Sequence, residues 1–591
     1  MKRTRLFAAA LLGAIAALPA AAAPHNVLIF VADGLRYVSV TPQSAPALWL
    51  AKSRGVDFTD SHSLYPTITT VNASAIATGH YIGDTGNFGN TLFSGFASPE
   101  AGGAPVAIME NDAVLGEMND HFGGNYLNET SLLAAARKAG FATAAIGKVG
   151  PTSIQDVTQR DGKGTIVIDD ALGTPAGIAL APEIADAIKA AGLSATAPKT
   201  SVPNVEQQTY MTAIATKVVL PRLAHSGHPF VMLFWSRDPD ASQHSQKDGI
   251  GKLVPGINGA TGRAGIKDAD DTFAALLAAL KAQGLDKTTD VFVTADHGFS
   301  TIDRHSKTSA AAKLSFADVP AGETPPGLVA IDLADALGLP LTDPHTRKPV
   351  DYKNGQRPTG GNGFLGSDPA NPDVMVIANG GSDHIYLPGG NAKDLAQKIV
   401  AAMAAEDYVG AIFVNDALGD IPGTLPMSAI NLRGAALTPQ PSIIIGFRST
   451  LIAGCQPELM CVAEVADTSL ETGQGMHGTF SRADTRNFMA AIGPDFKAGF
   501  ADKAPVSNAD IAPTLAHILG LVIAPKGTLT GRAATEALKG GKPVAVTHGW
   551  TAATAPVADG EKQFLEYQQV GPTRYFDAAG FPARTVGVSA H

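Results

Sequence analysis

Three aspartates and three histidines carry the chemistry that this sequence predicts. Each lies beside or soon after an apolar run: Asp33, Asp240, His244, Asp296, His297 and His477. Carboxylate oxygens and imidazole nitrogens are ligands of divalent metals, and together they favour zinc over magnesium. Two such ions about 3.5–4 Å apart can bind both the attacking and the leaving oxygen of a displacement at phosphorus. The six side chains therefore predict a two-metal hydrolytic site.

A threonine is the predicted nucleophile. Residues 65–72 contain Thr67, Thr69 and Thr70 and lead into a small-residue helix over residues 73–79. The N-terminus of a helix offers free N–H groups and the positive end of the helix dipole, which favour a phosphoryl group. A hydroxyl is a weak nucleophile at neutral pH, so its activation would fall to a bound metal.

Short apolar runs must position these residues. Asp33 follows the run over residues 27–31, Asp240 follows residues 230–235, and Asp296 follows residues 291–293. Continuous apolar runs are typical of strands buried on both faces of a parallel sheet, where ligands bind at the carboxyl ends of the strands. Helix-like runs at 130–139 and 268–283 alternate with strand-like runs at 141–146 and 290–294. The pattern predicts an α/β fold with a doubly wound sheet and helices on both faces.

Each of these residues also has a purely structural interpretation. Asp33 or Asp240 alone could cap a helix or close a turn, and His477 could be a solvated residue of a glycine-rich loop. Thr69 and Asn72 are ordinary residues for the start of a helix. The joint arrangement favours the metal site, because ligand types recur after several strand-like runs.

Five stretches of the chain, taken in order, resemble the alkaline phosphatase superfamily, most closely its type I phosphodiesterase / nucleotide pyrophosphatase branch. They are Val31–Gly34, Tyr65–Asn72, Pro239–Asp240 with His244, Thr294–Gly298, and Met476–Gly478. The resemblance implies one Zn²⁺ held by Asp240, His244 and His477. It implies a second Zn²⁺ held by Asp33, Asp296, His297 and the hydroxyl of Thr69. It also implies that Thr69 is the nucleophile and that Asn72 donates a hydrogen bond to a phosphoryl oxygen.

The sequence departs from the commonest family pattern next to the nucleophile. Thr70 and Val71 replace the usual Phe-Pro, and Ala73 stands where a histidine is frequent. No arginine follows Thr69 to grip the two free oxygens of a monoester. The sulfatase motif is absent too, because Glu458 and Leu459 follow the only Cys-x-Pro triplet.

These features predict a secreted two-zinc phosphodiesterase or nucleotide pyrophosphatase that acts through a phosphorylated threonine. Alternatives within the superfamily are a phosphomonoesterase and a phosphonoacetate hydrolase. An alternative of another class is a secreted metal-containing binding protein without turnover. No metal ligand and no nucleophile is missing from the sequence, which argues against the loss of turnover.

The N-terminus predicts export. Residues 1–5 are basic, residues 6–18 are apolar, and residues 19–23 offer small side chains for cleavage. We therefore expect a signal peptide over residues 1–23 and a periplasmic or secreted protein. The apolar run is short for a membrane span of roughly 20 residues. Cys455 and Cys461 are close in sequence and are expected to form a disulfide in an oxidising compartment.

The 591 residues exceed one compact core. The expected division is a first part of the catalytic core over 24–310, an inserted αβ cap subdomain over 311–440, and core completion with a C-terminal extension over 441–591. The formal charge of −10 offers no basic surface for a nucleic acid polymer, and no later segment predicts a stable membrane span. The expected partner is a small phosphate ester, with nucleotides among the candidates. The sequence leaves the oligomeric state open.

Overall fold

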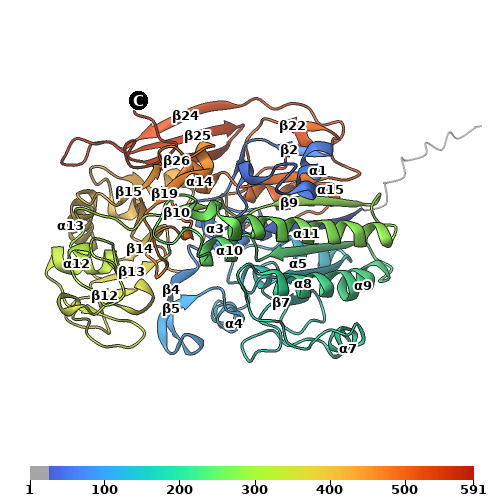
Figure 1. The fold of residues 1–591 in the computed structure, drawn as a ribbon, viewed down its shortest axis with the longest axis horizontal. Coiled ribbons are helices and arrows are strands. Elements are labelled where there is room, and N and C mark those ends of the chain that lie inside the picture. The colour runs from blue at the N-terminus through green and yellow to red at the C-terminus, as the bar shows by residue number, and fades with distance from the viewer. Residues whose placement is uncertain (1–24) are drawn as a thin grey trace, which may run out of the picture.

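The computed structural model describes residues 25–591 (Figure 1). The expected signal peptide, residues 1–23, lies outside the described residues. Two large sheets organise the rest of the chain, one of eight strands and one of seven. The expected α/β class is confirmed.

The eight-stranded sheet is mainly parallel. Its strand order is β22-β2-β21-β9-β1-β8-β6-β7. The bounds are β22 Phe500–Asp502, β2 Val56–Phe58, β21 Met489–Ile492, β9 Thr289–Thr294, β1 Asn26–Ala32, β8 Phe230–Ser236, β6 Ala142–Gly147 and β7 Ile166–Asp169. The five strands from β9 to β7 run parallel, and β21 is antiparallel to β9. Strand β1 therefore lies between β8 and β9, as a buried central strand should.

Helices cover both faces of this sheet. Successive side chains of β1 point to opposite faces, and each set packs against a different group of helices. Val27, Ile29 and Val31 pack in one apolar core with helices α2 (Thr69–Thr78), α4 (Asp112–His121), α5 (Leu132–Lys138) and α15 (Ile511–Leu519). Leu28 and Phe30 pack in another core with α1 (Pro46–Arg54), α7 (Pro182–Ala190), α8 (Val205–Ile214) and α11 (Ala260–Ala282). The predicted doubly wound architecture is confirmed.

The seven-stranded sheet forms the second part of the molecule, at the left in Figure 1. Its order is β11-β12-β13-β14-β17-β15-β16, with bounds β11 Leu341–Thr342, β12 Gly363–Leu365, β13 Val374–Ala378, β14 Ser382–Tyr386, β17 Ile443–Phe447, β15 Val409–Val414 and β16 Leu425–Pro426. Helices α12 (Leu328–Leu337) and α13 (Ala392–Ala404) share its apolar core. The run Ser442–Phe447 was expected to resume the first sheet, but β17 pairs with β14 and β15. Its apolar side chains are buried equally well there, so hydrophobicity could not distinguish the two sheets.

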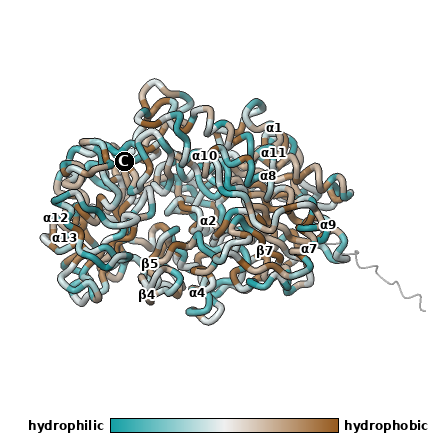
Figure 2. The backbone as a smooth tube through the Cα atoms, turned by 60° about the horizontal axis from the view of Figure 1, so that its bottom comes forward, coloured by the Kyte–Doolittle hydropathy of each residue, from teal (hydrophilic) through white to brown (hydrophobic). Residues whose placement is uncertain are grey.

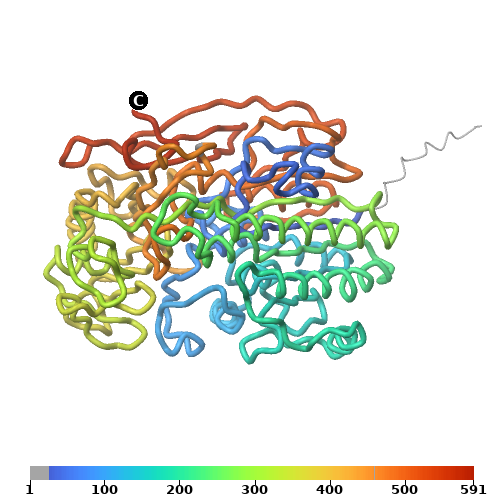
Figure 3. The backbone as a smooth tube through the Cα atoms, viewed as in Figure 1, coloured from blue at the N-terminus to red at the C-terminus, as the bar shows by residue number. Residues whose placement is uncertain are grey.

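Within the described part of the chain, four smaller sheets accompany the two large ones, among them a two-stranded hairpin and a three-stranded C-terminal sheet. The hairpin of β4 (Thr91–Ser98) and β5 (Ala104–Ile108) lies between the two large parts in both Figure 1 and Figure 2. After the second sheet the chain returns to the first part, and its last strands run over the top of the molecule (Figure 3). These are β24 (Thr547–Ala552), β25 (Phe564–Val570) and β26 (Thr573–Gly580).

Helix starts were the least accurate predictions. Helix α2 begins at Thr69 rather than at residue 73, and α11 begins at Ala260 rather than at residue 268. Polar residues in the first turns concealed the helical pattern. Within residues 25–591, none of the helices combines the length and the apolar character that a membrane crossing needs.

Candidate active site

Three neighbouring parallel strands bring the aspartates together at their carboxyl ends. Asp33 directly follows β1, Asp296 follows β9, and Asp240 opens the short helix α10 (Asp240–Ser245) after β8. Gly34 turns the chain after Asp33 with a φ of 68°, and an added Cβ there would lie 2.8 Å from the ring of Phe299. The Gly34 N–H donates to Asp296 Oδ1 over 3.0 Å, and the Asp240 N–H donates to the Asp33 carbonyl, also over 3.0 Å. The backbone thus fixes all three carboxylates.

The three histidines present the same ring nitrogen to these carboxylates. Nδ1 lies 2.8 Å from the Gly298 carbonyl in His297, 2.7 Å from the Gly475 carbonyl in His244, and 2.8 Å from the Thr67 carbonyl in His477. A carbonyl only accepts hydrogen bonds, so in each ring Nδ1 is the donor and Nε2 faces the carboxylates. Histidines that bind metals usually donate their other N–H to such a partner.

The second sheet helps to hold His477. The Gly381 N–H, in the turn between β13 and β14, donates to the His477 carbonyl over 2.9 Å. Gly380 turns the chain there with a φ of 71°. One of the six predicted ligands is therefore positioned both by the loop before α2 and by the turn between β13 and β14.

Carboxylate oxygens at the centre of the site have no hydrogen-bond partner among the described residues. They are Asp33 Oδ1, Asp240 Oδ1 and Asp296 Oδ2, and all are buried. The Nε2 of His297 lies 3.5 Å from Asp33 Oδ1 and 3.2 Å from Asp296 Oδ2. Around Asp240 Oδ1, Nε2 of His244 lies at 3.1 Å and Nε2 of His477 at 3.6 Å. An unpartnered buried carboxylate oxygen is costly, and a bound cation would satisfy all of them.

Two overlapping groups have the ligand atoms that a metal needs. Asp240, His297 and His477 form one group, and Asp33, Asp296 and His297 form the other. Within each group the candidate ligand atoms lie within 4.8 Å of one another. His297 belongs to both, whereas the resemblance placed it with one ion only. The residues therefore fit a divalent metal centre.

Electrostatics supports the same conclusion. Burial and the nearby Asp240 carboxylate raise the pKa of Asp33 to about 7, and burial with Asp33 raises the pKa of Asp296 well above its usual range. Burial lowers the pKa of His297 to about 3, which keeps the ring neutral. Burial also lowers the pKa of His477 well below its usual range, whereas at His244 burial is outweighed by the charge and hydrogen bond of the Asp240 carboxylate, which raise the pKa of the ring. Several carboxylates crowded beside two neutral imidazoles are arranged as they would be to receive positive charge.

Thr69 lies at the same place. It is the first residue of α2, only 1% exposed, and its Oγ1 lies 3.3 Å from Nε2 of His297. Thr67 points elsewhere, because its Oγ1 donates to the Thr479 carbonyl. The Thr70 hydroxyl is engaged with the Gly89 carbonyl. Among the threonines considered, Thr69 alone has its hydroxyl beside a candidate ligand.

The expected role of Asn72 does not fit its surroundings. Its Nδ2 donates to the carbonyls of Leu64 and Ile68, over 3.0 and 3.2 Å. Its Oδ1 accepts from the Leu64 N–H at 2.8 Å and from Asn508 Nδ2 at 3.0 Å. Both amide hydrogens are therefore used, and none is left for a phosphoryl oxygen. Asn72 braces the turn that leads to Thr69 instead.

Asn90 has the free donor that Asn72 lacks. Its Oδ1 accepts from the Thr70 N–H over 2.9 Å, which places the carboxamide at the N-terminus of α2. Its Nδ2 has no protein partner among the described residues. Asn90 lies between α2 and β4, and only the three-dimensional contact identifies this residue.

Lys148 is a second residue that the sequence reasoning missed. Its Nζ lies 2.9 Å from Asp33 Oδ2 and 3.2 Å from Asp240 Oδ2, and the side chain is 4% exposed. Asp33 Oδ2 also accepts from Nε1 of Trp235 over 2.8 Å. These contacts hold one oxygen of each aspartate and leave the other, Oδ1, facing the histidines. Lys148 directly follows β6, so the rule that singled out Asp33 could also have found it.

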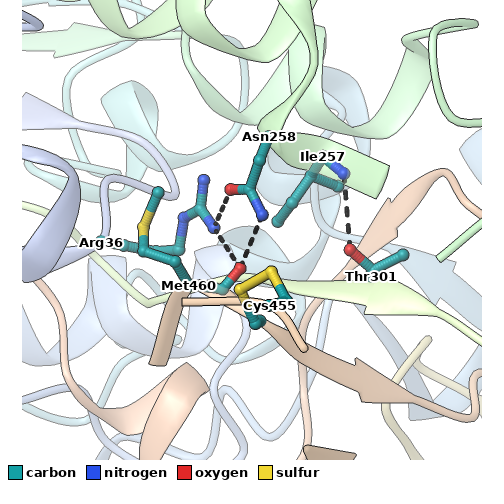
Figure 4. The surroundings of a disulfide bond; sticks show 7 residues. Arg36, Ile257, Asn258, Thr301, Cys455 and Met460 are labelled. Atoms are coloured by element: carbon teal, nitrogen blue, oxygen red, sulfur yellow. Dashed lines mark hydrogen bonds between the residues drawn. A yellow bond between two sulfur atoms is a disulfide. The ribbon is translucent and has the colours of Figure 1, made fainter. Parts of the chain in front are cut away.

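The disulfide lies beside Arg36 and Asn258 (Figure 4). Cys455 and Cys461 are bonded, with Cα atoms 5.6 Å apart, as expected. Inside the loop that they close, the Met460 carbonyl accepts from Asn258 Nδ2 at 2.7 Å and from Arg36 Nη1 at 3.4 Å. Arg36 is three residues from Asp33, so the disulfide loop is attached to the strand end that carries a candidate ligand.

Comparison with known proteins identifies one family. The model of the type I phosphodiesterase / nucleotide pyrophosphatase family matches residues 27–402. That range includes Asp33, Thr69, Asp240 and His297, whereas His477 follows it. No curated protein matches the chain.

Proposed function

Because the chain belongs to the type I phosphodiesterase / nucleotide pyrophosphatase family, we propose that it is a secreted two-zinc enzyme that hydrolyses phosphate diesters through a phosphorylated Thr69. The match confirms the family resemblance and, with the doubly wound sheet, the alkaline phosphatase-like fold. The family consists of metal-dependent hydrolases of small phosphate esters such as nucleotides. The metal, its number, the intermediate and the location are our proposals.

The observation that carries the proposal is the position of the Thr69 hydroxyl. It lies 3.3 Å from His297, the histidine shared by both candidate ligand groups. We assign one Zn²⁺ to Asp240, His244 and His477, and the other to Asp33, Asp296, His297 and Thr69. The chemistry that such ions supply is positive charge, which favours the ionised threonine hydroxyl and stabilises the oxygen that leaves.

Residues of the chain position the substrate for two displacements at phosphorus. Thr69 Oγ1 loses its proton and forms a bond to phosphorus while the bond to one ester oxygen breaks. That oxygen takes up a proton and leaves as an alcohol, and Thr69 carries the remaining phosphoryl ester. Water next attacks phosphorus, the bond to Thr69 breaks, and the hydroxyl regains its proton. The Asn90 Nδ2 donates to a non-bridging oxygen throughout.

The surroundings of Thr69 favour a diester over a monoester. Thr70 stands where an arginine clamp would bind both free oxygens of a monoester, and its hydroxyl and N–H are engaged with Gly89 and Asn90. A diester has one free oxygen fewer, so it needs this clamp less. Phosphomonoester or phosphonoacetate hydrolysis would require a cation that can reach those oxygens.

The test is the ratio of two kcat/KM values on zinc-loaded enzyme at alkaline pH. We expect bis-p-nitrophenyl phosphate to be preferred over p-nitrophenyl phosphate by about tenfold or more, and a chelator to abolish both activities. A preference for the monoester would overturn the diester assignment. Absence of turnover with either substrate, despite a full metal content, would favour the binding protein.

The variants Asn90→Ala and Asn72→Ala should distinguish the roles of the two asparagines. For Asn90→Ala we expect kcat to fall about 10²-fold, because removal of a single donor to a developing oxyanion costs about that much. Thermal stability should change little. Asn72→Ala should instead lower the melting temperature, because it leaves the buried Leu64 N–H and two carbonyls without partners. If Asn72→Ala lowered kcat without affecting stability while Asn90→Ala lost no activity, the roles would be reversed.

We also propose how the chain is divided and where it functions. Residues 24–310 begin the catalytic core, and the inserted unit starts near residue 311. It extends past residue 440, because β17 is part of its sheet. The disulfide fits an oxidising compartment such as the periplasm or the exterior.

A further inference from the structure

The candidate site opens to solvent on one side. Most of its residues are buried, but the Glu110 side chain is 29% exposed and the His244 side chain is 19% exposed. The Met109 N–H donates to the Asn90 carbonyl over 2.8 Å, so Glu110 lies next to the residue assigned to the phosphoryl oxygens. Glu110 follows β5 at the base of the β4–β5 hairpin. Glu110 is therefore a solvent-accessible carboxylate beside the candidate site.

Glu110 also neutralises the lysine of the site. Its Oε1 lies 3.0 Å from Lys148 Nζ, whose other two carboxylate partners are Asp33 and Asp240. Those two are 0% and 5% exposed, so among the described partners Glu110 alone faces solvent. Arg237 is a further, half-buried cation nearby, but Asp170 binds its Nε and Nη2 through both carboxylate oxygens. Lys148 is therefore the cation whose charge Glu110 cancels.

We propose that Glu110 is a specificity-determining residue that selects against phosphoryl groups with two negative charges. The inference rests on the proposed function and extends it to the charge of the substrate. A phosphate diester carries one negative charge, whereas a monoester carries nearly two above its second pKa of about 6. Glu110 places a negative charge at the opening of the site. It also pairs with the Lys148 ammonium, which would otherwise attract the second negative charge of a monoester. A diester has only one negative charge and depends less on the Lys148 ammonium. Glu110 therefore disfavours a diester less than a monoester.

General electrostatics sets the size of the expected effect. Unit charges several ångströms apart at a protein surface interact by a few kcal/mol at most, and solvent at a partly exposed carboxylate reduces this. We therefore expect Glu110→Gln to raise kcat/KM for p-nitrophenyl phosphate, relative to bis-p-nitrophenyl phosphate, by about tenfold. Glu110→Gln keeps the shape of the side chain and removes only its charge.

Glu100→Gln is the matched control, because Glu100 is an exposed residue on the tip of the same hairpin. It removes the same charge and should leave the substrate ratio unchanged. Glu110→Asp, which keeps the charge, should stay close to the wild-type ratio.

Inhibition provides a measurement that does not depend on turnover of the ester. Inorganic phosphate, a dianion at alkaline pH, should inhibit Glu110→Gln at about tenfold lower concentration than the wild type. Dimethyl phosphate, a monoanion, should inhibit both enzymes similarly. An unchanged ratio and unchanged phosphate inhibition in a folded, metal-loaded Glu110→Gln would overturn the inference. A wild type that prefers the monoester would instead overturn the proposed function, whatever the variant does.

Discussion

Thr69→Ala is expected to lower kcat for a phosphate diester about 10⁴-fold or more while the chain keeps its fold and its metal content. Loss of a nucleophile removes the covalent step, and such losses in other hydrolases have effects of this order. The Thr69 hydroxyl is 3.3 Å from Nε2 of His297 and makes no other side-chain hydrogen bond among the described residues. Stability should therefore change little. Stopped-flow or steady-state kinetics with elemental analysis of the same sample would check both parts.

Thr78→Ala is the matched control. Thr78 is a buried threonine at the other end of α2, and its Oγ1 donates to the Ser74 carbonyl. Its replacement should leave kcat within a few-fold of the wild type. Thr69→Ser, which keeps a hydroxyl, should recover part of the activity. If Thr69→Ala kept most of its activity, another group would have to attack phosphorus.

The sequence predicted the first sheet well because its central strands are continuous apolar runs. β1, β8 and β9 are buried on both faces, which is typical of short apolar runs in a parallel sheet. The second sheet was harder to delimit. β17 is as apolar as the strands of the first sheet, and only its pairing with β14 and β15 reveals where it belongs.

The candidate ligands were found because each follows a strand or loop motif that is local in sequence. The residues that support these ligands could not be found in this way. Asn90 reaches the start of α2 across 20 residues, and Lys148 reaches Asp33 across 115. For Asn72 the error was the opposite one. Its spacing matches the family motif, but its amide donates to the carbonyls of Leu64 and Ile68. Sequence spacing can suggest that a residue is near a site, but only the hydrogen bonds show which of its atoms are free.

The inserted unit does more than add a second sheet. The turn between β13 and β14 holds the His477 carbonyl, and Asn379 beside that turn binds both the N–H and the carbonyl of Thr91 at 2.9 Å. Thr91 follows Asn90 directly. Displacement of the unit would therefore move a candidate ligand and Asn90, the proposed phosphoryl donor, together, which would couple the proposed cap to the site.

His477→Ala should reduce the metal content from two ions per chain toward one and lower kcat/KM at least 10²-fold. His477 Nε2 lies 3.6 Å from Asp240 Oδ1, an oxygen that has no hydrogen-bond partner among the described residues. Loss of one of three ligands weakens the ion assigned to Asp240, His244 and His477, while Asp33, Asp296 and His297 remain. Elemental analysis after dialysis against a weak chelator measures this directly.

His384→Ala is the control that distinguishes loss of a metal ligand from loss of a buried imidazole ring. His384 is 0% exposed in β14, and burial lowers the pKa of its ring to about 3, so it is a neutral core residue like His477. Its replacement opens a comparable cavity and should lower the melting temperature, yet the metal content should stay at two. If both variants lost metal equally, general destabilisation would explain the loss. If His477→Ala kept two ions, the assignment of His477 as a ligand would be wrong, and His297, which already belongs to both candidate groups, would have to serve in its place.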